Sequence, residues 1–152
     1  MSKPIFIATH PNFEKDDISI VSQNLFSLPN EKDEKIVGNF QDLVSEYFKI
    51  QAFAVDSARS ALYLLLKSLN FSEGSEVILP AFSCMVISNA VKWAGLKPIF
   101  VDCSKVDFNY DFDDLSKKIT DNTKAILVQH TFGFPENIQK LREILGNNVF
   151  IV

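Results

Sequence analysis

The sequence predicts an α/β fold, a mainly parallel β-sheet with flanking helices. Along residues 52–152, short apolar segments alternate repeatedly with segments of helical periodicity, and the connections between them are short. The apolar segments lack the polar–apolar alternation of a half-exposed strand. Residues 125–128, for example, are all apolar, which is typical of a strand buried on both faces. Alternation of this kind builds βαβ units, whose strands run parallel.

The N-terminal part, residues 1–35, is predicted to be an irregular lead-in. It contains Pro4, Pro11 and Pro29 and a charged run at 31–35, with room for one short helix at 16–26. The domain proper is expected to occupy residues 36–152. It opens with a helix at 36–48, where apolar residues recur at helical spacing.

The remaining elements follow in strict alternation. Strands are predicted at 52–55, 75–79, 98–102, 124–129 and 149–152, and helices at 57–69, 83–94, 113–119 and 137–145. Ordinary end signals support these helices: Asp111 is a candidate N-cap, and Gly95 and Gly146 each follow a predicted helix.

Composition excludes several classes of protein. The chain has 152 residues, 47% hydrophobic and 22% charged, as expected for a globular domain with a real core. Its net charge is −4 and its basic residues are scattered, so no nucleic-acid partner is expected. No apolar run is long enough for a membrane span or a signal peptide, and we expect a cytoplasmic protein. Cys84 and Cys103 are expected to be free thiols, and no metal-site spacing is present.

The first candidate site is the predicted strand-to-helix turn that contains Ser57, Ala58, Arg59 and Ser60. Small residues there let the backbone approach a ligand, and the free amides of a helix start favour an anion. Two serine hydroxyls and a guanidinium add further donors. The alternative interpretation is that Asp56 or Ser57 simply caps the helix.

Two further candidates follow later strands. At the end of the 75–79 strand, Phe82 or Cys84 is placed to touch a ligand; alternatively, Ser83 caps the next helix and Phe82 packs in the core. His130 follows the 124–129 strand, at the edge where parallel sheets bind ligands, and is either a ligand residue or a packed, hydrogen-bonded loop residue. The fingerprints of dinucleotide-binding and P-loop folds are absent.

Several stretches, taken in order, resemble one family, the DegT/StrS-type sugar aminotransferases that use pyridoxal 5′-phosphate (PLP). The matching stretches agree in order and spacing from about residue 40 to 152, and several in register are specific where one alone is not. They are residues 53–62, 73–83, 88–91, 94–102, 123–126 and 130–133.

The resemblance implies that residues 36–152 form part of the large domain of a fold-type-I PLP transferase. It also implies an enzyme, usually a homodimer with shared active sites. Such enzymes move an amino group from glutamate to a keto sugar carried on a nucleotide, in the synthesis of cell-surface polysaccharides or of secondary-metabolite sugars.

The resemblance further assigns roles to the candidate residues. It places the PLP phosphate on the helix start at Ser57, Ala58, Arg59 and Ser60, where Ala58 replaces the usual glycine and Arg59 a threonine. Cys84 lies where many members have an aromatic side chain that stacks on the cofactor ring. A cysteine cannot stack in this way, so the ring must be held differently. His130 lies in the last matching stretch and is expected to line the cofactor site.

The family's catalytic residues are expected beyond Val152. There the fifth strand continues into an acidic pair whose aspartate holds the pyridine nitrogen, and the Schiff-base lysine comes later still. No catalytic residue is therefore assigned, and the chain alone is not expected to transaminate. Two other hypotheses remain: a catalytically inactive module that binds a small molecule or partner with half of the fold, and an unrelated α/β domain of the flavodoxin or receiver kind.

Overall fold

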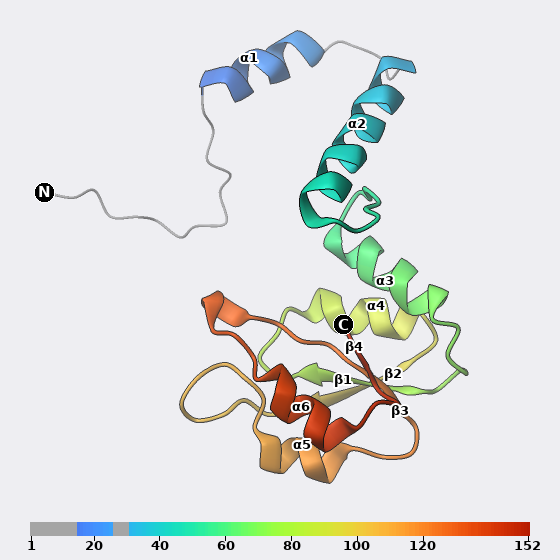
Figure 1. Ribbon diagram of the computed structural model, residues 1–152, viewed down its shortest axis with the longest axis vertical. Helices are drawn as coiled ribbons and strands as arrows, with labels where there is room; N and C mark the ends of the chain where they lie inside the picture. The colour runs from blue at the N-terminus through green and yellow to red at the C-terminus, as the bar shows by residue number, and fades with distance from the viewer. Residues whose placement is uncertain (1–14, 26–30) are drawn as a thin grey trace, which may run out of the picture. The chain divides into compact units, whose positions relative to one another are not determined.

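The computed structural model describes residues 15–25 and 31–152, and the chain divides between Ala54 and Val55 into two compact units. The described part of the first unit consists of helices α1 (Lys15–Asn24) and α2 (Glu31–Phe48) (Figure 1). Both predicted helices are present, and α2 begins earlier than the predicted start at residue 36. The rest of the predicted lead-in, residues 1–14 and 26–30, lies outside the described residues.

The second unit carries the α/β fold, and Figure 1 shows its helices on both sides of a sheet. Its elements, in chain order, are α3 (Ala58–Ser68), β1 (Glu76–Pro80), α4 (Met85–Trp93), β2 (Lys97–Val101), α5 (Phe112–Lys118), β3 (Thr123–Ile126), the 3₁₀ turn η1 (Thr131–Gly133), α6 (Ile138–Leu145) and β4 (Phe150–Ile151). Apart from η1, which was not predicted, each lies within a few residues of its predicted position.

All the strand pairs are parallel, in the order β2-β1-β3-β4. Ile78 at the centre of β1 is paired with Ile99 on one side and Ile126 on the other. Every residue of β1 is buried, as expected for a central parallel strand covered on both faces. The predicted fold class is therefore confirmed.

The two faces of the sheet pack against different helices because successive side chains of a strand point to opposite sides. Val77 and Leu79 of β1 contribute to a core cluster with Leu66 of α3 and Val91 of α4. Ile78, between them, joins the cluster on the other face, which includes Leu115 of α5, Leu141 and Leu145 of α6, and Tyr110. The unit thus has three layers, with helices on both faces of the sheet.

One predicted strand is wrong. Residues 52–55 form no strand, and the backbone amides there are bonded to side chains of α2. The Ala52 amide donates to Ser45 Oγ at 2.9 Å, and the Ala54 amide donates to Gln41 Oε1 at 2.8 Å. An apolar segment becomes a strand only where a neighbouring strand accepts its hydrogen bonds. Here one serine side chain and one glutamine side chain accept these bonds instead.

The parallel arrangement decides where a site can form. The carboxyl ends of β1, β2 and β3 meet at one edge of the sheet, where parallel α/β folds bind their ligands. The loops after these strands contain Cys84, Asp107 and His130 respectively. Across residues 15–25 and 31–152, no helix is both long enough and apolar enough to cross a membrane.

Candidate functional site

The start of α3 brings together Ser57, Ala58, Arg59 and Ser60. Ser57 occupies the N-cap position with extended backbone, and its hydroxyl accepts a hydrogen bond from the Ser60 amide at 3.2 Å. The two serine hydroxyl oxygens lie 3.0 Å apart. The capping interpretation of Ser57 is therefore confirmed. The first-turn amides and the positive end of the helix dipole still make this helix start suitable for an anion.

Arg59 is exposed and lies against an aromatic ring of the neighbouring helix. Its guanidinium carbon is 5.6 Å from the centroid of the Trp93 ring, a cation–π distance. Trp93 is the last residue of α4, whereas Cys84 lies at the opposite end of that helix. A stacked guanidinium keeps its in-plane donors available. The expected pairing of Arg59 with a phosphate stays a prediction.

For the loop between β1 and α4, the alternative interpretation as a cap and a core residue is wrong, and contact of Phe82 or Cys84 with a ligand stays a prediction. Helix α4 begins after Cys84, which occupies the N-cap position without a side-chain cap bond, so Ser83 is not the cap. Phe82 is 54% exposed and is not a core residue. The reason is that the ladder with β2 continues past β1: the Ala81 amide donates to the Val101 carbonyl at 2.8 Å. The turn into α4 therefore begins later in the sequence than predicted, and Phe82 is left exposed at the edge of the sheet.

A cavity of about 320 Å³ lies between this loop and the segment that follows β3. It is lined by Ala81, Phe82, Ser83, Cys84, Gln129 and Thr131. Ser83 Oγ and Gln129 Oε1 are both buried without a hydrogen-bond partner. Buried polar atoms of this kind are rare in proteins and call for an explanation. The structure therefore brings Cys84 next to both neighbours of His130, whereas Ser57 to Ser60 do not line this cavity.

His130 is exposed and is held by a hydrogen bond within its loop. Its Nδ1 accepts from the Glu136 amide at 3.1 Å. The carboxylate of Glu136 is buried and accepts from two amides, those of Tyr110 at 2.9 Å and Asn137 at 2.8 Å. The hydrogen bond to Nδ1 agrees with the interpretation of His130 as a packed, hydrogen-bonded loop residue, but the side chain is exposed rather than packed. Its contact with a ligand stays a prediction.

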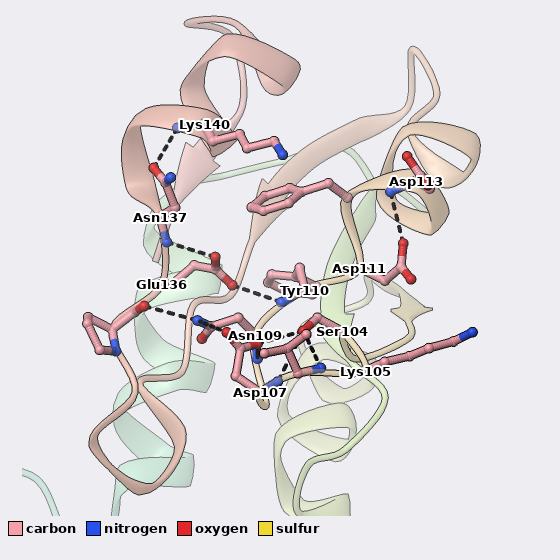
Figure 2. A pocket seen from close by; sticks show the side chains of 13 residues that line it. Ser104, Lys105, Asp107, Asn109, Tyr110, Asp111, Asp113, Glu136, Asn137 and Lys140 are labelled. Atoms are coloured by element: carbon pink, nitrogen blue, oxygen red, sulfur yellow. Dashed lines mark hydrogen bonds between the residues drawn. The ribbon is translucent and has the colours of Figure 1, made fainter.

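A larger cavity of about 590 Å³ lies beside Glu136, between the β2–α5 loop and the start of α6 (Figure 2). Most of the polar groups drawn there form hydrogen bonds that stabilise the loops or cap the helices. The Ser104 hydroxyl donates to Asp107 at 2.8 Å and, with the Asn109 amide, keeps the pKa of Asp107 below its ordinary value. Asp111 and Asn137 cap α5 and α6. We therefore regard this cavity as a structural feature and the smaller one as the candidate ligand site.

Four phenylalanine rings gather at the same edge of the sheet. Phe108 lies 5.3 Å from Phe82, 5.0 Å from Phe132 and 6.1 Å from Phe134, between ring centroids. Phe132 and Phe134 are 71% and 48% exposed, which is unusual for large aromatic side chains in a cluster. Phe132 also has a φ of 54°, in the left-handed region that is costly for a bulky residue.

Sequence reasoning missed Gln129 and did not single out the role of Glu136. Gln129 is a polar residue at the end of an otherwise apolar strand segment, and that position at the carboxyl edge was the available signal. Glu136 gave no local signal, because its bond to the Tyr110 amide joins residues 26 apart in the sequence. Asp107 is a turn former stabilised by its own loop.

The fold and its edge define a class: a parallel α/β domain whose loops gather a helix start, polar side chains and a cavity at the carboxyl edge of the sheet. The chain belongs to the DegT/DnrJ/EryC1/StrS aminotransferase family, whose model matches residues 14–151. This confirms the resemblance seen in the sequence and excludes an unrelated flavodoxin-like or receiver-like domain.

Relatives of known activity are similar to this chain. It is 34% identical over 118 residues to a GDP-perosamine synthase of Escherichia coli O157:H7, covering 76% of this chain and 32% of that protein. It is 36% identical over 106 residues to a 3-oxo-glucose-6-phosphate:glutamate aminotransferase of Bacillus subtilis, covering 69% and 24%. The chain thus spans between about a quarter and a third of the length of these relatives.

The fold is also found in solved structures. The PLP form of a putative sugar aminotransferase, Spr1654 of Streptococcus pneumoniae, superposes with a TM-score of 0.73 at 26% identity. The superposition covers 88% of this chain and 34% of that one. The α/β unit described above is therefore part of a PLP-transferase fold.

Proposed function

We propose that this chain supplies the N-terminal part of a PLP-dependent aminotransferase that transfers an amino group from glutamate to a nucleotide-linked keto sugar. The observation that carries the proposal is the start of α3, where Ser57 and Ser60 present adjacent hydroxyls at the positive end of a helix, with Arg59 beside them. Such a helix start suits a phosphate group, and family membership names PLP as the molecule that would bring one.

The residues present fit the cofactor in two places. Ser57, Ala58, Arg59 and Ser60 would hold the phosphate. The polar cavity beside Cys84 contains Ser83 Oγ and Gln129 Oε1, which are buried without partners and are therefore available to a polar ring. When bound, PLP supplies an electron sink that stabilises negative charge on the substrate. The residues of this chain would bind and orient it.

The substrate class rests on the relatives. One acts in GDP-perosamine synthesis and another is a glutamate aminotransferase of a phosphorylated keto sugar. A keto sugar on a nucleotide, in the synthesis of cell-surface polysaccharides or secondary-metabolite sugars, is the substrate that we infer. We further propose a homodimer in the cytoplasm, with residues 36–152 as part of its large domain.

A second candidate is a module that binds the cofactor or a related ligand without transaminating. The smaller cavity suits it as well, because its polar lining groups would bind a ligand whether or not a lysine is supplied to the site. Binding and turnover are therefore separate questions for this chain, and one experiment addresses each of them.

Binding is tested with pyridoxamine 5′-phosphate, which forms no bond to lysine. We expect the chain to bind it, inorganic phosphate to compete, and S57A/S60A to weaken binding about tenfold or more because two donors and the cap are lost. Ser68→Ala is the matched control, since Ser68 lies at the other end of α3. Equal binding by wild type and S57A/S60A would contradict the phosphate site.

Turnover is tested by supplying glutamate and PLP with a 4-keto-6-deoxy sugar linked to GDP or to dTDP, and measuring 2-oxoglutarate. In the protein that carries this chain, we expect 2-oxoglutarate to form only when a keto sugar is present. If pyridoxamine 5′-phosphate binds but no 2-oxoglutarate forms with either sugar, the binding module becomes the better account.

A further inference from the structure

The cavity beside Cys84 has features that specify what a ligand there must present. It combines two polar atoms without partners and a large exposed aromatic side chain, Phe82. A buried polar atom without a partner is costly, and so is a large apolar side chain that is exposed on the surface. A ligand that covers them removes both costs. The three residues come from two loops at the carboxyl edge of the sheet, so one ligand can contact all of them.

The polar atoms define what a ligand must present. Gln129 Oε1 only accepts hydrogen bonds, whereas the Ser83 hydroxyl both donates and accepts. The two groups do not bond to each other, and each is buried. A ligand that satisfies them carries an N–H or O–H group for Gln129 and a second polar atom for Ser83. Loss of either bond leaves a buried group without a partner.

The aromatic side chain defines the shape of the ligand. Phe82 stays 54% exposed although it lies 5.3 Å from the Phe108 ring and 6.5 Å from the Phe132 ring. The Phe108 and Phe132 rings pack against Phe82, which also lines the cavity. A supported ring with a free surface suits offset or edge-to-face packing with a second planar ring.

We propose that Phe82 provides the aromatic surface for the cofactor ring and that Ser83 and Gln129 hydrogen-bond to the polar edge of that ring. This inference rests on the proposed function and assigns three residues to it. Phe82 thereby takes the part that Cys84, with its small thiol, cannot take. A pyridine ring with its hydroxyl and methylamine groups presents the donors and the flat surface that the cavity requires. All three are positioning residues.

The test uses two probes, pyridoxamine 5′-phosphate and pyridoxamine without the phosphate, with binding measured by calorimetry and by the fluorescence of the pyridoxamine ring. We expect Ser83→Ala and Gln129→Leu each to weaken binding of both probes about three- to tenfold, the loss of one hydrogen bond. Phe82→Ala should weaken both to a similar extent and shift the ring fluorescence. Phe82→Tyr should restore both readouts.

Matched controls separate the cavity from the cluster and from general damage. Phe134 is an exposed ring of the same cluster that does not line the cavity, so Phe134→Ala should leave both affinities unchanged. Gln139, on the exposed surface of α6, is the control for Gln129. Circular dichroism at the binding temperature verifies that each variant is folded.

The outcomes distinguish this inference from the function on which it rests. If wild type binds pyridoxamine 5′-phosphate and S57A/S60A weakens it, but the three cavity variants bind as wild type does, the ring-site inference is overturned and the phosphate site stands. If wild type binds neither probe at millimolar concentration, both proposals fall. If the cavity variants weaken binding of a free hexose but not of either probe, the cavity is a sugar site and the inference is wrong.

Discussion

The Tyr110 hydroxyl donates a hydrogen bond of 2.6 Å to the carbonyl of Leu127. Tyr110 is only 3% exposed and comes from the loop after β2, whereas Leu127 follows β3. The bond therefore joins the loop that carries Phe108 to the strand segment that leads to Gln129 and His130. It fixes the β2–α5 loop, whose Phe108 ring lies against Phe82, relative to the segment after β3 that lines the candidate site.

Tyr110→Phe should destabilise the second unit by about 1–2 kcal/mol, because it leaves the Leu127 carbonyl without this partner in a buried position. The measurement is urea unfolding followed by the fluorescence of Trp93, the only tryptophan in the chain. Tyr47→Phe is the control, since Tyr47 is exposed on α2. An unchanged midpoint in Tyr110→Phe would show that the bond contributes nothing net.

Burial raises the pKa of Tyr110 well above its ordinary value, with a smaller contribution from the nearby Glu136 carboxylate. A pKa raised on folding means that the stabilisation is fully present below the unfolded value of about 10 and is lost above it. The difference in stability between wild type and Tyr110→Phe should therefore be constant from pH 6 to 9. It should shrink at higher pH, as unfolding curves across that range would show.

Glu136 connects three segments around the larger cavity, and its removal should be costly. Glu136→Ala leaves the amides of Tyr110 and Asn137 without acceptors, and we expect a loss of about 2–3 kcal/mol. Glu136→Gln keeps one acceptor oxygen and should lose about half as much. NMR hydrogen exchange of these two amides provides the check, with Glu143→Gln on the exposed side of α6 as control. Equal exchange in all variants would contradict the bonding.

Local sequence patterns predicted the elements of the second unit well because its packing is regular. Apolar segments of β1 and β3 are buried on both faces, and glycine and capping residues mark the helix ends at Asp111 and Gly146. The failure at residues 52–55 has a different origin. An apolar run indicates that a segment can be buried. Whether it becomes a strand depends on a neighbouring strand that is distant in the sequence. Here side chains of α2 accept the hydrogen bonds of the amides instead.

The candidate site was predictable only in part for the same reason. Ser57 and Cys84 were found because helix starts and family motifs mark them. The polar role of Gln129 and Ser83 became clear only in three dimensions, where both are buried without a hydrogen-bond partner. Two interpretations of Phe82 were open, a ligand contact or a core residue, and the core interpretation is wrong although phenylalanine is usually buried. Its exposure follows from the extra ladder bond between Ala81 and Val101, which no local pattern encodes.

Glu76 should make the fold sensitive to acid. The Thr120 hydroxyl donates to its carboxylate at 2.6 Å and the Lys97 ammonium at 3.0 Å, and these bonds, with the Thr120 bond the larger cause, lower the pKa of Glu76. A pKa lowered on folding means that the stabilisation is present above the unfolded value, about 4.5, and is lost as the pH falls through the folded value.

Urea midpoints measured from pH 7 to pH 3 check this prediction. Wild type should lose stability over the acid part of that range, and Glu76→Gln should lose less. Thr120→Val should shift the acid transition more than Lys97→Met, because Lys97 is largely exposed and its attraction is screened by solvent. Glu73→Gln, at an exposed site nearby, serves as control. Parallel pH profiles for wild type and Glu76→Gln would refute the assignment.

Gly146 ends α6 in a backbone conformation that other residues rarely adopt, with φ 67° and ψ −163°. An added Cβ would meet nothing within 4 Å, so any cost of Gly146→Ala comes from the backbone rather than from a clash. We expect Gly146→Ala to lower the free energy of unfolding by about 1–3 kcal/mol, measured by the Trp93 transition in urea. Asn147→Ala, at the next exposed position, should change it little.

The Gly146→Ala substitution should also loosen the start of β4. The reason is that the Gly146 amide closes α6 on Arg142, and Arg142 in turn donates to the Val149 carbonyl at 2.6 Å. Faster hydrogen exchange of the Val152 amide, which bonds to Ile126, would reveal that loosening; unchanged exchange would confine the strain to the helix end.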